Sequence, residues 1–165
     1  MLTKNKTIFL VILFCLINAY CSYAESNIIV GKVIKVIDGD TIYIKHKDFG
    51  KMKVRLADID APELDQPYGK ESKQLLKEII DKKTIKLKKI AKDKYDRVIG
   101  VIYYNNLEIN HYLVINGLAW CYDYYNQRIE IKDAENEAKQ KKIAIWSSSK
   151  IPIAPWQWRK GIRNE

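Results

Sequence analysis

The stretch that decides the fold is IIVGKVIKVIDGDTIYI, residues 28–44. Residues 28–36 are rich in β-branched side chains and partly alternate between apolar and polar, which predicts a strand. The tripeptide DGD at residues 38–40 interrupts this strand with turn-forming residues, and residues 41–44 resume the extended pattern. We therefore expect a hairpin-like pair of strands that carries two acids at its turn.

Strand and helix patterns alternate over the rest of the chain. Residues 52–56 (MKVRL) place apolar side chains on one face and basic ones on the other, which predicts a third strand. Two further strands are predicted at residues 84–90 and 98–104. Helical spacing predicts three helices, at residues 70–82, 109–116 (closed by Gly117) and 129–142. This order indicates the α+β class: a five-stranded OB-fold β-barrel with three helices packed against it.

The N-terminal segment is typical of a signal peptide. Lys4 and Lys6 precede an apolar run at residues 8–17 that is too short to span a bilayer comfortably. Ser22 and Ala24 are small residues at the positions that a signal peptidase reads, so we predict cleavage after Ala24. The alternative is an uncleaved membrane anchor. Cleavage would give an exported protein, secreted or periplasmic, without stable membrane association.

This pattern divides the chain into three parts: a signal peptide (1–24), one OB-fold domain (25–147) and a polar and aromatic tail (148–165). We expect the tail to lie on the surface or to be partly loose. After cleavage Cys121 is the remaining cysteine, so no internal disulfide can form. The stability of the domain then depends on its hydrophobic core.

The charge of the chain favours a polyanionic partner. Lysine and arginine number 29 against 20 aspartates and glutamates, a formal charge of +9. Such an excess is consistent with binding to the backbone of nucleic acid. Charge alone carries little of this inference, because much of it would also suit an ordinary solvated surface.

Acids and arginines recur in an order that suggests phosphate chemistry. Asp40 and Asp60 follow strands that a twisted barrel can bring together, and their oxygens suit a hard divalent cation. Glu63 is a further carboxylate, free to act on a water molecule. Arg55 and Arg97 offer planar guanidinium groups that match phosphate oxygens. Taken singly, each has an ordinary interpretation as a turn acid or a solvated arginine. The whole set favours metal-assisted cleavage of a phosphodiester.

Several motifs carry a family resemblance: VIDGDT (36–41), RL (55–56), DIDAPE (58–63), YGKE (68–71), DKYDR (93–97) and NGLAW (116–120). With them, the chain resembles the thermonuclease family of micrococcal or staphylococcal nuclease-like enzymes, from about residue 28 to residue 146. The ending PWQWRK, residues 155–160, is also similar to one found in exported bacterial members. The resemblance implies an OB-fold barrel and a Ca²⁺-dependent phosphodiesterase that acts on DNA and RNA. We expect a monomer.

The resemblance also implies a ligand set and a water-activating group. Calcium would be bound by the carboxylates of Asp40 and Asp60 and by the backbone carbonyl of Ala61. Glu63 would act on the attacking water, either as general base or by orienting it. In-line attack would expel the 5′-oxygen and leave 3′-phosphate ends.

Phosphate contacts are implied for the two arginines. Arg55 and Arg97 would bind the phosphate and stabilise the five-coordinate transition state. Lys94 and Tyr95, in the DKYDR motif, would lie at the substrate.

Among the departures of this chain from the staphylococcal enzyme, one concerns base stacking. Asp123 falls near the place where that enzyme stacks a base on tyrosine. Tyr122, Tyr124 and Tyr125 surround it and are candidates to replace the tyrosine, although packing roles are equally expected. A noncatalytic OB module that binds single-stranded nucleic acid is the alternative function, but pure binding needs no carboxylates beside a polyanion.

Overall fold

The computed structural model of the protein describes residues 27–122 and 128–163. The predicted signal peptide and the region of Asp123, Tyr124 and Tyr125 lie outside the described residues. Among those described, no helix is long and apolar enough to cross a membrane.

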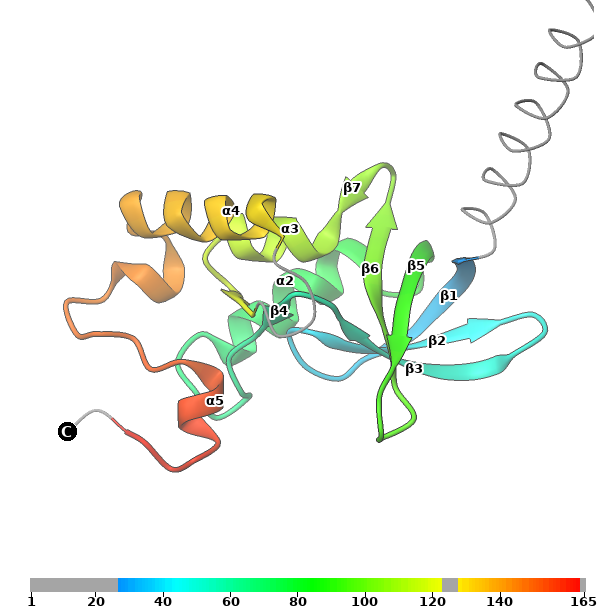
Figure 1. Cartoon of the computed structure of the whole chain (residues 1–165), viewed down its shortest axis with the longest axis horizontal. Helices are drawn as coiled ribbons and strands as arrows, with labels where there is room; N and C mark the ends of the chain where they lie inside the picture. The colour runs from blue at the N-terminus through cyan, green and yellow to red at the C-terminus, as the bar shows by residue number, and fades with distance from the viewer. Residues whose placement is uncertain (1–26, 123–127, 164–165) are drawn as a thin grey trace, which may run out of the picture.

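A closed β-barrel forms one side of the molecule (Figure 1). Its five strands are β1 (Ile28–Val36), β2 (Thr41–His46), β3 (Gly50–Leu56), β5 (Thr84–Lys92) and β6 (Val98–Tyr104). Neighbours pair antiparallel in the order β3-β2-β1-β5-β6, and a parallel pairing of β3 with β6, at Val54 and Val98, closes the barrel. A short strand, β7 (Leu107–Glu108), extends the sheet beyond β6. The predicted five-stranded OB-fold barrel is confirmed.

The partial alternation of the first strand has a structural cause. The pairing of β1 with β2 shifts between Val33 and Lys35, which marks a bulge. The bulge changes which residues face inward, so Val33 and Val36 are both buried although they are three residues apart. The barrel interior is then filled by branched side chains such as Ile42, Ile44, Leu56, Leu87 and Ile102.

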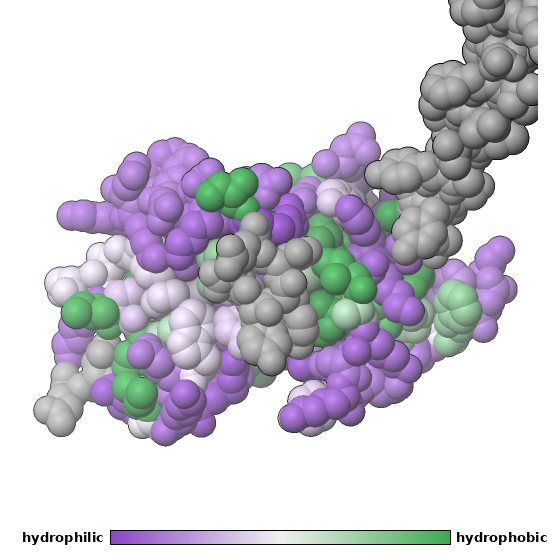
Figure 2. Space-filling model, in the orientation of Figure 1, coloured by the Kyte–Doolittle hydropathy of each residue, from purple (hydrophilic) through white to green (hydrophobic). Residues whose placement is uncertain are grey.

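Three helices of some length pack against the barrel, as predicted. They are α2 (Gly69–Ile80), α3 (Ile109–Ile115) and α4 (Ile129–Gln140). Gly117 has a φ of 63°, the left-handed conformation expected of a residue that closes a helix. Figure 2 shows hydrophilic residues over the outward face of α4, opposite the buried Ile131, Ala134 and Ala138.

Two short strands connect the barrel to the helices and carry the site. β4 (Ile59–Asp60) pairs antiparallel with β8 (Trp120–Cys121), so that Asp60 lies opposite Trp120. β4 directly follows β3, and residues 61–68 then form the loop that leads to α2.

The C-terminal tail, here residues 148–163, is more ordered than we expected. After a 3₁₀ helix (Ala144–Ser147) the chain returns to the body of the domain and forms the four-residue helix α5 (Pro155–Trp158) (Figure 1). Ala154 and Pro155 are buried, and Gln66 donates from Nε2 to the carbonyl of Ile153 at 2.6 Å. The tail lies on the surface, as we expected, but Ala154, Pro155 and the hydrogen bond from Gln66 fasten it to the domain.

Candidate active site

One cavity of about 420 Å³ gathers nearly all the residues that the sequence singles out. Those that line it are Asp40, Arg55, Asp60, Ala61, Glu63, Tyr95 and Arg97. Lys94 does not line the cavity; its Nζ lies 5.1 Å from the centre of the Tyr95 ring. The fold thus brings one set of acids and arginines together, and their chemical roles remain predictions.

Asp40 is placed by the turn between β1 and β2. Its Oδ2 accepts a hydrogen bond of 2.8 Å from the backbone N–H of Ala61, which ties this turn to the residue after β4. Its Oδ1 accepts from the Thr41 hydroxyl at 3.0 Å, and its own N–H donates to Asp38 Oδ1 at 3.1 Å. The Asp40 carboxylate is therefore held beside Ala61, whose backbone carbonyl is another predicted ligand.

Arg55 binds the carboxylates of both Asp40 and Asp60. It lies on β3 opposite Thr41 of β2, with a side chain only 14% exposed. Nη1 donates to the carbonyls of Leu56 and Ile59, both at 2.9 Å, and forms an ion pair with Asp40 at 3.1 Å. Nη2 donates to Asp60 Oδ1 at 2.8 Å. Besides its predicted phosphate contact, Arg55 is thus a structural link between β3, β4 and both carboxylates.

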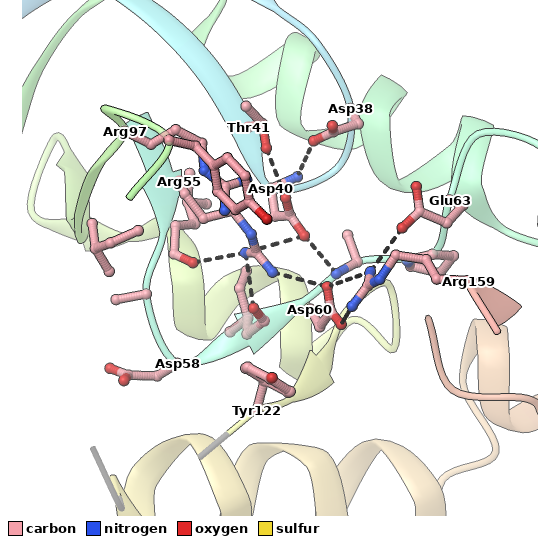
Figure 3. A pocket seen from close by; sticks show the side chains of 17 residues that line it. Asp38, Asp40, Thr41, Arg55, Asp58, Asp60, Glu63, Arg97, Tyr122 and Arg159 are labelled. Atoms are coloured by element: carbon pink, nitrogen blue, oxygen red, sulfur yellow. Dashed lines mark hydrogen bonds and ion pairs between the residues drawn. The ribbon is translucent and has the colours of Figure 1, made fainter. Parts of the chain in front are cut away.

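A second guanidinium, which the sequence analysis did not assign to the site, approaches Asp60 from the other side (Figure 3). Arg159 of the tail donates from Nη2 to Asp60 Oδ2 at 2.7 Å and from Nη1 to Asp60 Oδ1 at 3.3 Å. Nη1 also donates to Glu63 Oε1 at 2.7 Å. The ending PWQWRK was the available sequence signal, but nothing in its spacing indicates that its arginine reaches residue 60.

The loop that carries Glu63 is held in place by a hydrogen bond between two of its own residues. The backbone N–H of Glu63 donates to Gln66 Oε1 at 3.1 Å. Gly69, at the start of α2, packs so closely that a side chain there would collide with the carbonyl oxygen of Glu63. The absence of a side chain at Gly69 therefore lets this loop pack against the start of α2, and Glu63 lines the cavity.

Arg97 reaches the cavity from the turn between β5 and β6. Asp93 accepts from Arg97 Nε at 2.7 Å and from the Arg97 backbone N–H at 3.0 Å. Tyr95, which is 68% exposed, lies beside it, with the Arg97 guanidinium carbon 5.5 Å from the ring centre. Asp96 has a φ of 64°, a left-handed conformation that glycine, asparagine and aspartate adopt most readily. The turn therefore presents an oriented guanidinium and an exposed aromatic ring.

Burial and charge shape the ionisation of the acid cluster, defined here as Asp38, Asp40, Asp60 and Glu63. Burial, together with the charge of Asp40, raises the pKa of Asp38 to about 6. Burial also raises the pKa of Asp60, although hydrogen bonds and charge from Arg159 and Arg55 act in the opposite direction. The hydrogen bond to Asp60 raises the pKa of Arg159 further above its ordinary value. Burial is thus the main influence on the pKa of both carboxyl groups, and the charges of their neighbours come second.

The donor set suits a hard divalent cation. No group of three or more histidine, cysteine, aspartate or glutamate side chains in the described part of the chain is arranged to hold a metal ion. The predicted set needs only the carboxylates of Asp40 and Asp60 and the carbonyl of Ala61, with substrate oxygens and water completing the shell. A cationic guanidinium already binds the Asp60 carboxylate. These carboxylates therefore attract positive charge, and the set of oxygens would suit a divalent cation such as the predicted Ca²⁺.

One candidate for base stacking lies at the cavity. Tyr122 lines it, and its ring is 5.6 Å from that of Trp156 in the tail. This contact gives Tyr122 a packing partner as well as access to the site. Tyr124 and Tyr125, the other candidates, lie outside the described residues.

Comparison with known proteins adds an independent finding. Residues 53–148 match the model of a family described as staphylococcal nuclease homologue. An "Uncharacterized endonuclease" of Haemophilus influenzae is 36% identical over 151 residues, which cover 92% of this chain and 82% of that protein. A protein of the same name in Escherichia coli is 36% identical over 130 residues, covering 78% and 84%. "Staphylococcal-like nuclease CAN1" of Arabidopsis thaliana is 41% identical over 113 residues, 68% of this chain but only 35% of the plant protein.

Proposed function

Because this chain belongs to the family of staphylococcal nuclease homologues, we propose that it is an exported, Ca²⁺-dependent nuclease that hydrolyses DNA and RNA with little sequence specificity. One observation carries the proposal: two aspartates, a glutamate and two guanidinium groups predicted to act together line a single cavity. The endonuclease and nuclease names of the relatives support the same activity.

Each side chain has a separate task in the proposed reaction. Glu63 takes a proton from the attacking water or orients it. Bound calcium supplies positive charge that neutralises the phosphate and helps to align the water. The new bond forms between the water oxygen and phosphorus, and the bond to the 5′-oxygen breaks. The departing oxygen takes up a proton, and a 3′-phosphate end remains.

The two barrel arginines stabilise the charge that grows on phosphorus. Asp93 holds Arg97 by its Nε, and we assign the terminal nitrogens of Arg97 to phosphate oxygens. Arg55 contributes positive charge from the wall of the cavity, next to Asp60. A guanidinium suits this task because it stays charged throughout turnover.

The proposed cellular form is a monomer that is released after cleavage behind Ala24 and is secreted or periplasmic. Mass spectrometry of the exported protein tests this form, because cleavage at the proposed position gives a chain that begins at Glu25. A protein that retains residue 1 would contradict it.

Cleavage assays on plasmid DNA and on RNA, with calcium, magnesium or a chelator, test the activity. We expect cleavage with calcium and none with chelator. Asp40→Ala should abolish the calcium-dependent rate. The matched control Asp48→Ala changes an exposed acid at the turn between β2 and β3 and should leave the rate unchanged. Undiminished cleavage by Asp40→Ala would remove Asp40 from the ligand set.

A second variant separates catalysis from binding. Glu63→Gln should slow cleavage by roughly 10²–10⁴-fold, because the carboxylate that acts on the water is lost. Binding to DNA, measured by fluorescence anisotropy, should stay within about twofold of wild type, because Glu63 contributes no positive charge to the contact with phosphates. Loss of binding in parallel with loss of rate would instead mark Glu63 as a structural residue.

A further inference from the structure

The C-terminal tail packs against the domain and thereby places Arg159 at the acid cluster. Besides the hydrogen bond from Gln66 to Ile153, Trp158 Nε1 donates to Asp65 Oδ1 at 3.2 Å. The ring of Trp156 lies 5.7 Å from that of Trp120, edge to face. These contacts join the tail to the loop that bears Glu63 and to β8. Arg159 therefore reaches the cavity from a fixed base, although its own side chain is 46% exposed.

The contacts of Arg159 coincide with a predicted calcium ligand. Both oxygens of Asp60 accept hydrogen bonds from its guanidinium, and Oδ1 accepts from Arg55 as well. Asp60 is 2% exposed, so water does little to screen these charges. A cation from the tail thus already neutralises the carboxylate that the catalytic cation would use.

We propose that Arg159 and the catalytic divalent cation compete for Asp60, so that the tail sets the calcium concentration at which the site fills. The proposal rests on the proposed function, because it takes Asp60 as a calcium ligand. Arg159 acts here as a positioning residue: it holds Asp60 and Glu63 in place without the metal and gives up Asp60 when the metal binds.

Arg159 and the divalent cation repel each other, because both are positively charged. Calcium binds oxygen ligands at about 2.3–2.6 Å. A doubly charged ion bound to Asp60 would have to share the carboxylate with the guanidinium, which already donates to both of its oxygens. The repulsion acts in a poorly screened site and is therefore strong.

Arg159, and not Arg55, is the group that yields. Arg55 is 14% exposed and is also bonded to the carbonyls of Leu56 and Ile59, so moving it would leave buried polar groups unpaired. Arg159 is more exposed and keeps a second acceptor, Glu63 Oε1, when it leaves Asp60. The released guanidinium then remains at the edge of the cavity, next to the carboxylate that acts on water.

Calorimetric titration of Ca²⁺ into the purified protein, without nucleic acid, tests the competition. Arg159→Gln should bind calcium about tenfold more tightly than wild type, because calcium no longer has to displace the Arg159 guanidinium from Asp60. Arg163→Gln is the matched control on the same tail. Its guanidinium donates to the carbonyls of Trp158 and Ile162 and stacks on the Trp158 ring, so its loss should change the affinity by less than about twofold.

Thermal melting gives a readout that does not depend on activity. Without calcium, Arg159→Gln should melt below wild type, since Asp60 has lost a cationic partner. Added calcium should then raise its melting temperature by more than it raises that of wild type. Arg159→Lys, which keeps the charge but loses the planar fork, should lie between the two in calcium affinity.

Two outcomes would overturn the inference, and they can be told apart. If folded Arg159→Gln binds calcium no more tightly than wild type, the competition is wrong while the proposed function stands. If calcium binds to neither protein, the calcium dependence of the proposed function fails and the competition fails with it.

Discussion

Two arginines reach the same aspartate from regions of the molecule that are built in opposite ways. Arg55 lies in a closed barrel, where backbone pairing fixes its position opposite Thr41 and its side chain is 14% exposed. Arg159 follows a four-residue helix in a tail that side-chain contacts hold in place, and it is 46% exposed. Asp60 therefore has one partner that the fold fixes and one that it can release.

Because Arg55 and Arg159 differ in burial and in how they are held, we assign them different functions. The barrel arginine joins β3, β4 and the acid cluster, so the stability of the domain and the geometry of the site depend on the same guanidinium. Within the described residues, the guanidinium of the tail arginine donates hydrogen bonds to the carboxylates of Asp60 and Glu63 at the cavity. We expect substitutions in the barrel to affect folding and activity together, and substitutions in the tail to affect the site more than they affect folding.

Replacement of the barrel arginine should have the largest effect. Arg55→Gln should lower the free energy of unfolding by about 3 kcal/mol, because it leaves the buried Asp40 carboxylate without its cation and removes one of the two cations that bind Asp60. It should also lower the cleavage rate by about 10³-fold, as expected when a donor that stabilises developing charge is lost. Urea denaturation and single-turnover cleavage measure the two losses.

The tail variant Arg159→Gln is the comparison for this experiment. It removes a guanidinium from the same Asp60 but leaves the carbonyls of Leu56 and Ile59 paired with Arg55, so its loss of stability should be clearly smaller. Equal losses in the two variants would show that the tail is as much a part of the folding unit as the barrel.

An intermediate effect is expected where the tail is fastened. Gln66 is 7% exposed and joins the two regions: Oε1 accepts from the Glu63 N–H and Nε2 donates to the Ile153 carbonyl. Gln66→Ala should lower the free energy of unfolding by about 1 kcal/mol and should make the tail more sensitive to limited proteolysis. Mass spectrometry of the fragments would locate the first cuts between residues 148 and 163.

Gln74→Ala provides the matched control for this change. Gln74 is an exposed residue of α2 whose amide bonds Glu78 within the same helix. Its replacement should leave the fragment pattern as in wild type. An unchanged tail in Gln66→Ala as well would mean that the tryptophan contacts suffice to hold it.

The barrel and its site were predictable for a common reason. The strands have local signatures in branched residues and turn acids, and β3 leads within a few residues from Arg55 to Asp60 and Glu63. Once the strands are placed, the chain direction alone brings these side chains to one end of the barrel. Arg97 follows for a similar reason, because its turn joins β5 to β6, and β6 pairs with β3.

The contribution of the tail could not be predicted in this way. Arg159 meets Asp60 across 99 residues of sequence, and α5 is too short to show a helical period. Its position depends on where Trp156 and Ile153 find room against β8 and the loop after β4, which only the packed structure specifies. Contacts made by side-chain docking between distant segments leave no periodic pattern in a single sequence.

The smallest expected effect concerns the ionisation of Asp38, an acid of the barrel that lines the cavity. Burial and the charge of Asp40 raise the pKa of Asp38 from its ordinary value of 3.8 to about 6, although Arg55 and Arg159 lie in the same cavity. The folded protein therefore binds a proton at Asp38 more tightly than the unfolded chain. The stabilisation is fully present below pH 3.8 and is lost as the pH rises through about 6.

Asp38→Asn removes the loss of stability that accompanies ionisation of Asp38, and it keeps an acceptor oxygen for the Asp40 N–H. With chelator present, the variant should melt roughly 3 °C above wild type near neutral pH and should match it near pH 4, where the wild-type carboxyl is protonated. Melting curves at a series of pH values measure the difference. A constant difference at every pH would indicate a packing effect of the substitution. A difference that vanishes at neutral pH would mean that burial and the charge of Asp40 do not raise the pKa of Asp38 in the folded protein.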